Sequence, residues 1–374
     1  MSAAVTAGQG GAQVNFSNLT SDNIAAASQT AESGLQWIRK GTLIVGSPNG
    51  PGGSTTQPAL DLSAFRFTFQ IRQQDAGSPN TAVIRVYNLA NRTAKQIQQE
   101  FTRVVVQAGY ENTNFGIIFD GTIVQTRIGR ERNVDSFLDI MATEGDLPYN
   151  FSVVNQTLAP GASQKDVLAA LSAVLGPYGF PVVPPPDDPA SGESNDLIGG
   201  TLPRGRVLFG MAMQHLDTVA KTTGTTWVVQ NGKIVMVPLT GYLPNEVPVI
   251  TSQTGLVGVP QSTQQGIELT ILINPKIMVG TRIQINNALV NQTQNKDGNI
   301  LPSYDNPFAG AYASVVDDGF YRVIVQDFEG DSRGNPWYAK LICLALDSSA
   351  APGQSVPLYP SGTATGGATG GGLG

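Results

Sequence analysis

The stretch AFRFTFQIR, residues 64–72, alternates apolar and polar side chains from Phe65 onward. A period of two is typical of a β-strand with one face in a core and the other in water. Further strands are expected at residues 82–87, 103–110 and 136–143, and a pair of strands within 116–128. Because turn-forming residues separate these runs at intervals of about 8–12 residues, we predict an antiparallel barrel or sandwich.

A short helix is expected between two of these strands, at residues 93–101. Ala94, Ile97 and Phe101 recur at spacings of three and four, as the apolar stripe of an amphipathic helix does. Asn91 or Thr93 is the candidate N-cap of this helix.

The character of the chain changes at residue 151. Ser163 and Asp166 have the spacing of a capping box that begins a helix, and Gly176-Pro177 would end it. A second helix is expected at residues 207–222. Asn231-Gly232 between two apolar runs then predicts a β-hairpin. Residues 151–248 are therefore interpreted as a small α+β domain.

Residues 249–347 again have the pattern of β-strands, notably at 266–273, 281–285, 319–325 and 337–346. The predicted fold is mainly β with an α+β insert, in which two related antiparallel β-barrel domains flank the small α+β domain. The predicted units are an N-terminal extension (1–34), a first barrel (35–150), the insert (151–248), a second barrel (249–347) and a Gly-rich C-terminal tail (348–374).

Composition favours a subunit of an assembly. The chain has 374 residues, of which 41% are hydrophobic and only 13% charged, about half the usual charged share. A water-soluble chain with so few charged residues has a surface that is either rich in amides and hydroxyls or covered by other chains. The net charge of −6 without a run of Lys or Arg argues against tight nucleic-acid binding. A single cysteine, Cys343, excludes an internal disulfide and is expected to be buried.

The sequence has neither the charge and apolar pattern of a signal peptide nor a run of 18 apolar residues. We therefore expect a protein that is made and kept in a cytosol and is not inserted into a membrane.

No motif for catalysis, cofactor binding or metal binding is found, and we predict no enzyme activity and no cofactor. His215, the only histidine, is expected at a helix surface or a domain contact. Trp227 and Trp337 are expected in the core, and Trp37 at a subunit boundary. The acidic residues beside glycines are interpreted as solvated turns, with paired glycosidase acids or a calcium loop as the alternatives. They are Glu144, Asp146, Asp297, Asp317, Asp318, Glu329 and Asp331, with Asp327 nearby.

Four ordered sets of segments carry a resemblance to a known family. The first is residues 84–89 (IRVYNL) with the helix that follows. The second is 109–111 (GYE), 118–123 (IFDGTI) and 137–146 (FLDIMATEGD). The third is 216–221 (LDTVAK) with 226–234 (TWVVQNGKI). The fourth is 254–260 (TGLVGVP), 272–281 (LINPKIMVGT) and 330–337 (GDSRGNPW).

Together these segments resemble the baseplate hub proteins of contractile-tailed bacteriophages, a family shared with related tail devices and type VI secretion hub and spike proteins. The match covers about residues 40–347, in the order of the family. The resemblance implies tube-like barrels, a homotrimeric ring, and contacts with the tail tube protein, the central spike protein, the tape measure and other baseplate proteins. It also implies a virion protein of the tail baseplate that is assembled in the host cytoplasm.

Low charge suits the wall of a channel through which DNA passes without specific binding, because each Lys or Arg contact with a phosphate adds affinity. A strongly basic channel surface would contradict this hypothesis. The alternative function is a carbohydrate- or receptor-binding tail protein, possibly active on peptidoglycan. No lysozyme-like domain is present in the sequence to support cell-wall cleavage.

Overall fold

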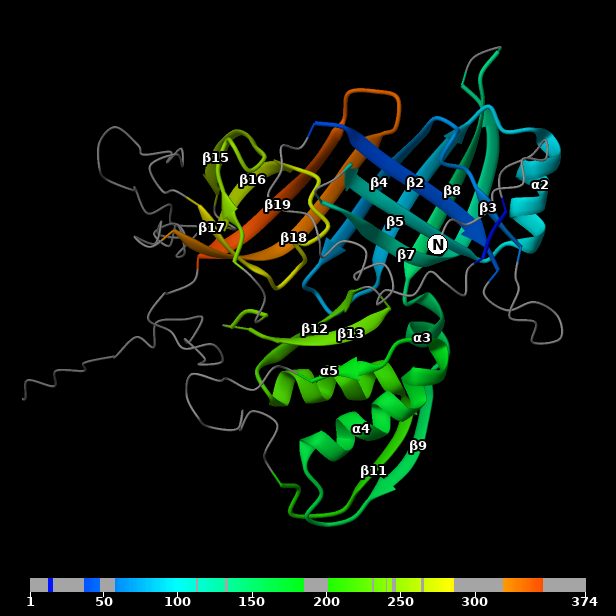
Figure 1. Ribbon diagram of the computed structural model, residues 1–374. Coiled ribbons are helices and arrows are strands. Elements are labelled where there is room, and N and C mark those ends of the chain that lie inside the picture. Colours follow the sequence, from blue (N-terminus) through cyan, green and yellow to red (C-terminus); the bar gives the residue numbers. More distant parts are fainter. Residues whose placement is uncertain are drawn as a thin grey trace, which may run out of the picture.

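A computed structural model describes residues 13–15, 37–47, 58–111, 114–131, 134–184, 201–230, 232–239, 241–243, 247–263, 266–285 and 319–345. Most of its strands belong to one 14-stranded sheet, in which the order along the main path is β1-β3-β2-β6-β7-β8-β5-β4-β18-β19-β16-β15. Two smaller sheets and two longer helices lie below it in Figure 1. The expected class, mainly β with an α+β insert, is confirmed.

The N-terminal β region supplies one half of the large sheet, in antiparallel pairs. Its strands are β1 (Gln13–Asn15), β2 (Arg39–Gly46), β3 (Pro58–Asp61), β4 (Phe67–Gln74), β5 (Asn80–Tyr87), β6 (Arg103–Tyr110), β7 (Phe115–Arg130) and β8 (Ser136–Glu144). Helix α2 (Asn91–Glu100) connects β5 to β6 and buries Ala94 and Ile97.

The C-terminal β region supplies the other half. Its strands are β14 (Val249–Ile250), β15 (Leu256–Thr263), β16 (Gly266–Leu272), β17 (Arg282–Ile285), β18 (Phe320–Asp331) and β19 (Trp337–Ala345). The two halves join where β18 pairs with β4, from Val325↔Gln74 to Asp331↔Thr68. The two predicted β regions therefore form one continuous hydrogen-bonded sheet. The prediction of two barrel domains did not include this connection between them.

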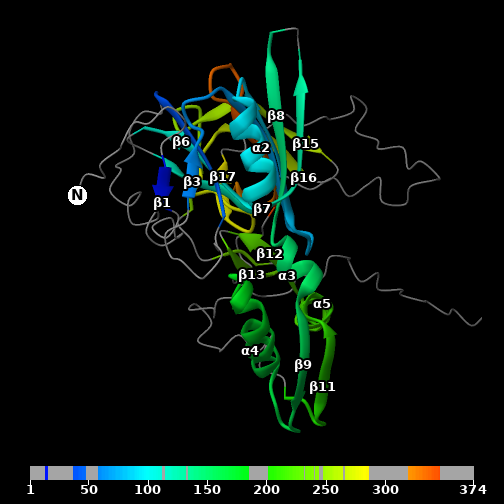
Figure 2. The ribbon, with the colours of Figure 1, turned by 90° about the vertical axis from the view of Figure 1, so that its right-hand side faces the viewer.

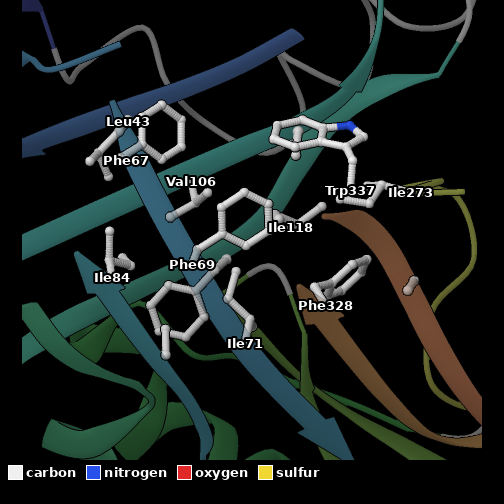
Figure 3. Close-up of a cluster of buried hydrophobic side chains, with 14 of the residues drawn as sticks. Leu43, Phe67, Phe69, Ile71, Ile84, Val106, Ile118, Ile273, Phe328 and Trp337 are labelled. Atoms are coloured by element: carbon white, nitrogen blue, oxygen red, sulfur yellow. The ribbon is translucent and has the colours of Figure 1, made fainter. Parts of the chain in front are cut away.

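Alternation along the strands explains why the two halves share one core. In β4, Phe67, Phe69 and Ile71 are buried, whereas the residues between them are more exposed. Figure 3 shows these side chains beside Phe328 and Trp337 from the C-terminal region. The Phe69 and Trp337 rings meet edge to face at 5.5 Å, a favourable aromatic geometry.

Close approach of the backbone requires glycine next to Trp337. A Cβ atom on Gly41 would lie 2.8 Å from Trp337 Cη2 and 3.1 Å from Phe67 Cζ. The indole Nε1 of Trp337 donates a hydrogen bond to Gly109 O at 3.2 Å. Trp337 thus packs against β2 and β6 of the other half, which fixes the two halves together.

The insert has its own core. Its elements are α3 (Asp146–Phe151), β9 (Val153–Leu158), α4 (Gln164–Leu175), η2 (Gly176–Tyr178), β10 (Val182–Val183), β11 (Arg206–Met211), α5 (Ala212–Thr222), β12 (Thr225–Gln230) and β13 (Lys233–Pro238). Leu171 and Leu216 from the two longer helices pack with Trp227 in this core. The predicted capping box of Ser163 and Asp166 is confirmed, and α4 ends at Leu175, directly before Gly176.

Several local predictions are wrong. The expected helix 207–222 begins only at Ala212, because β11 (Arg206–Met211) pairs antiparallel with β9 along its whole length. The strand pair expected within 116–128 is one 16-residue strand, β7, whose pairing with β8 shifts register between Ile123 and Gln125. The N-cap of α2 is Ala90, with no side-chain hydrogen bond, so neither Asn91 nor Thr93 caps that helix.

The predicted hairpin of β12 and β13 is confirmed, with Gln230 opposite Lys233; Asn231 in its turn lies outside the described residues. Figure 2 shows the β7–β8 hairpin projecting at one end of the molecule and the β9–β11 ribbon at the other. Among the described residues, no helix is both long and apolar enough to cross a bilayer.

Candidate functional site: a charge-paired face of the sheet

One face of the large sheet packs on the core, and the opposite face carries charged and polar side chains at alternate positions. Along β4 these are Thr68, Gln70, Arg72 and Gln74, between buried neighbours. We call the charged set on this side the charge-paired face. It comprises Arg66, Arg72, Arg85, Arg127 and Lys340 with Asp139, Glu268, Asp327, Glu329 and Asp331.

In the N-terminal half of this face, Asp139 of β8 accepts hydrogen bonds from two arginines. Arg85 Nε lies 2.7 Å from Asp139 Oδ1, and Arg127 Nη2 lies 2.8 Å from Asp139 Oδ2. The three residues stand opposite one another on β5, β8 and β7, so the sheet register sets the pairing. Both guanidinium groups also lie over the Phe137 ring, at 4.2 Å and 5.6 Å from its centre, which restricts their movement.

The other cations of the face have carboxylate partners across strands as well. Arg66 Nη2 lies 2.7 Å from Asp331 Oδ2, which links β18 to the residue just before β4. Lys340 Nζ lies 2.7 Å from Glu268 Oε1, between β19 and β16. Arg72 Nε approaches Asp327 Oδ1 at 3.7 Å, between β4 and β18. Each of these ion pairs therefore joins neighbouring strands of the sheet.

The pairing changes the proton affinities of the groups. Burial alone would raise the pKa of the Asp139 carboxyl, but hydrogen bonds from Arg85 and Arg127 outweigh it and hold the pKa below its ordinary value. For Asp331, burial is likewise outweighed, chiefly by Arg66, and the pKa is lowered. Because the folded-state pKa lies below the unfolded one, both carboxylates stabilise the fold at neutral pH. That stabilisation is lost as the pH falls below about 4.

A second charged cluster, which is fully buried, lies where the insert meets the sheet. Arg322 of β18 pairs with Asp75, the residue after β4, and both side chains are about 5% exposed or less. The Nη1 atom of Arg322 also donates to the backbone oxygens of Leu239 at 2.9 Å and Gly241 at 3.1 Å. A single guanidinium thus contacts both halves of the sheet and the insert.

His215 and Cys343 have structural positions. His215 lies on α5, partly exposed, with Nε2 3.2 Å from the backbone oxygen of Phe209, as expected for a histidine at a helix surface. Cys343 is buried in β19, as predicted, and burial raises the pKa of its thiol far above the ordinary value. Among the described residues, no three His, Cys, Asp or Glu side chains are grouped as metal ligands would be.

The interpretation of the acidic residues as solvated turns is wrong for four of them, because Glu144 lies in β8 and Asp327, Glu329 and Asp331 lie in β18. Glu144 is 1% exposed and accepts hydrogen bonds from Asn80 Nδ2 at 2.9 Å and from the Gly232 amide at 3.2 Å. Asp331 is 7% exposed because it pairs with Arg66. Asp146 begins α3 and accepts a hydrogen bond from Asn150 at 2.9 Å. Asp297, Asp317 and Asp318 lie outside the described residues.

The tryptophans divide as expected between core and surface. Trp227 and Trp337 are each 1% exposed, whereas Trp37 is 77% exposed, and its place at a subunit boundary remains a prediction. Sequence reasoning missed the charge-paired face altogether. Arg72 on β4 and Arg85 on β5, at polar positions of alternating strands, were a visible signal. The partner of each depends on strand register, which the sequence does not specify.

No protein-family model matches the chain, and no curated protein sequence matches it. Solved structures do resemble it in fold. A tail protein from Neisseria meningitidis has a TM-score of 0.48 and 11% identity, covering 82% of this chain and 96% of its own. The 43 kDa tail protein of prophage MuSo2 from Shewanella oneidensis has a TM-score of 0.48 and 8% identity, covering 81% and 97%.

An E. coli component of the type VI secretion system, described as structurally similar to bacteriophage T4 tail proteins, has a TM-score of 0.48 and 10% identity. It covers 79% of this chain and 77% of its own. These three solved structures are two tail proteins and a type VI secretion component, each at 11% sequence identity or less.

Proposed function

We propose that the chain is a structural virion protein without enzyme activity, a baseplate hub subunit that forms a ring between the tail tube and the central spike. The observation that carries the proposal is the single sheet formed by both β regions, with its core on one side and the charge-paired face on the other. The wall of a channel needs a sheet of this kind. Further copies of the chain would close the ring, and the polar face of the sheet would line the water-filled channel.

The ordered resemblance described from the sequence supplies the finer details of the proposal. The ring is a homotrimer. It contacts the tail tube protein, the central spike protein, the tape measure and other baseplate proteins, and DNA passes through its lumen without specific binding. The chain acts in the virion, at the tail baseplate, after assembly in the host cytoplasm. Residues 35–150 and 249–347 are the two tube-like domains, and 151–248 is the insert between them.

The experiment that tests the proposal is to determine the symmetry of the purified full-length chain. Native mass spectrometry should give three copies, and cryo-electron microscopy class averages should show a ring with an axial opening. A compact monomer without a central hole, at concentrations where tail proteins assemble, would contradict the proposal.

The alternative, a carbohydrate- or receptor-binding protein, would need exposed aromatic side chains beside paired acids. Among the described residues, Trp227 and Trp337 are buried and Glu144 is held by backbone and amide donors, whereas Trp37, Phe151 and Phe209 are exposed. Exposed aromatic side chains alone do not favour the alternative over the hub.

A further inference from the structure

The cations of the charge-paired face are already paired with carboxylates, and this pairing affects whether they can bind phosphate. Arg85 and Arg127 share Asp139, Arg66 is bound by Asp331, and Lys340 by Glu268. Arg66 and Arg85 each donate two N–H groups side-on to a carboxylate, the same pair that a phosphate would take. Arg72 and Lys340 are ion-paired through single contacts, at 3.7 Å and 2.7 Å. A nucleic acid that approaches this face must therefore compete with carboxylates fixed by the sheet register.

We propose that the carboxylates Glu268 and Asp327 act as built-in competitors of DNA phosphate, and that their removal converts the face into a DNA-binding surface. The proposal rests on the proposed function in one respect, that this face meets DNA. It goes further by assigning the lack of adhesion to named residues rather than to low overall charge.

Glu268 and Asp327 are the best choice for a test because both lie beside Lys340 on neighbouring strands of the face. Asp327 stands opposite both Arg72 on β4 and Lys340 on β19, and Lys340 pairs with Glu268. Both carboxylate side chains are partly exposed, at 39% for Asp327 and 37% for Glu268. Exposed ion pairs contribute little to stability, so their loss should leave the fold intact.

The test uses the full-length chain carrying Glu268→Gln and Asp327→Asn, with binding of a double-stranded DNA fragment measured across a salt series. The matched control carries Glu100→Gln and Glu111→Gln, which change the net charge equally at exposed positions outside the face. Freed Arg72 and Lys340 should steepen the log–log salt dependence of binding by about 0.9 for each phosphate that they contact.

We expect the Glu268→Gln, Asp327→Asn protein to bind DNA measurably more tightly than both the wild-type and control proteins, and the difference to vanish at high salt. Equal binding by this variant and the control would overturn the proposal, since net charge alone would then explain the result. Ring formation is measured separately. A ring without increased DNA binding rejects only this inference, and increased binding without a ring rejects only the proposed hub.

Discussion

Arg322 joins three parts of the chain through one side chain. It lies on β18, pairs with Asp75 beside β4, and donates to the backbone oxygens of Leu239 and Gly241 in the insert region. Removing one partner of a buried pair leaves the other charge without compensation, and this loss is costly. No sequence pattern marks Arg322, because its partners lie far away along the chain.

We predict that Arg322→Gln lowers the free energy of unfolding by about 3–5 kcal/mol, since Asp75 would remain buried without its cation. Lys340→Gln, at an exposed pair, should cost about 1 kcal/mol or less. Chemical denaturation of both variants measures the difference. Equal, small effects would show that the buried pair contributes no more than a surface pair does.

At the scale of elements, sequence patterns predicted what local chemistry controls. The alternation at residues 64–72, the capping box at Ser163 and the hairpin at Asn231-Gly232 depend only on neighbouring residues, and the corresponding elements are present. The prediction failed where a distant partner decides. Residues 207–211 have apolar side chains compatible with a helix, but pairing with β9 makes them a strand.

Ser163→Ala should test the capping box as a local element. The Ser163 side chain accepts a hydrogen bond from the Asp166 amide, which alanine cannot replace, so that amide would keep only its bond to the Ser163 backbone oxygen. We expect a loss of about 1 kcal/mol in the free energy of unfolding, with increased hydrogen exchange in the first turn of α4. Lys165→Ala, at an exposed position in the same turn, should change stability by about 0.5 kcal/mol or less.

At the scale of the whole molecule, the shared core makes the two β regions one unit and leaves the insert with its own core. Neither the joining of β4 to β18 nor the charge-paired face could be predicted from the sequence. Both depend on which strands pair and in which register, and alternation within a strand does not indicate which strand lies beside it.

Phe69→Ala tests this unity, because Phe69 is 1% exposed and packs against Trp337 from the other half. A loss of about 3–5 kcal/mol is expected. Hydrogen exchange should show reduced protection in β4 and β5 and equally in β18 and β19. Leu216→Ala, in the core of the insert, should reduce protection mainly in α4 and α5. Protection lost only in β4 and β5 would mean that the two halves unfold independently.

The pairing of β4 with β18 also constrains biosynthesis. Arg66 and Asp331, which meet at this seam, are separated by 265 positions along the chain. While the ribosome is still translating the insert, β4 has an edge whose final neighbour does not yet exist. Such an unpaired edge can form hydrogen bonds with strands of other chains, so the nascent chain has to avoid aggregation until β18 emerges. Late completion of the sheet would make full-length synthesis a prerequisite for assembly.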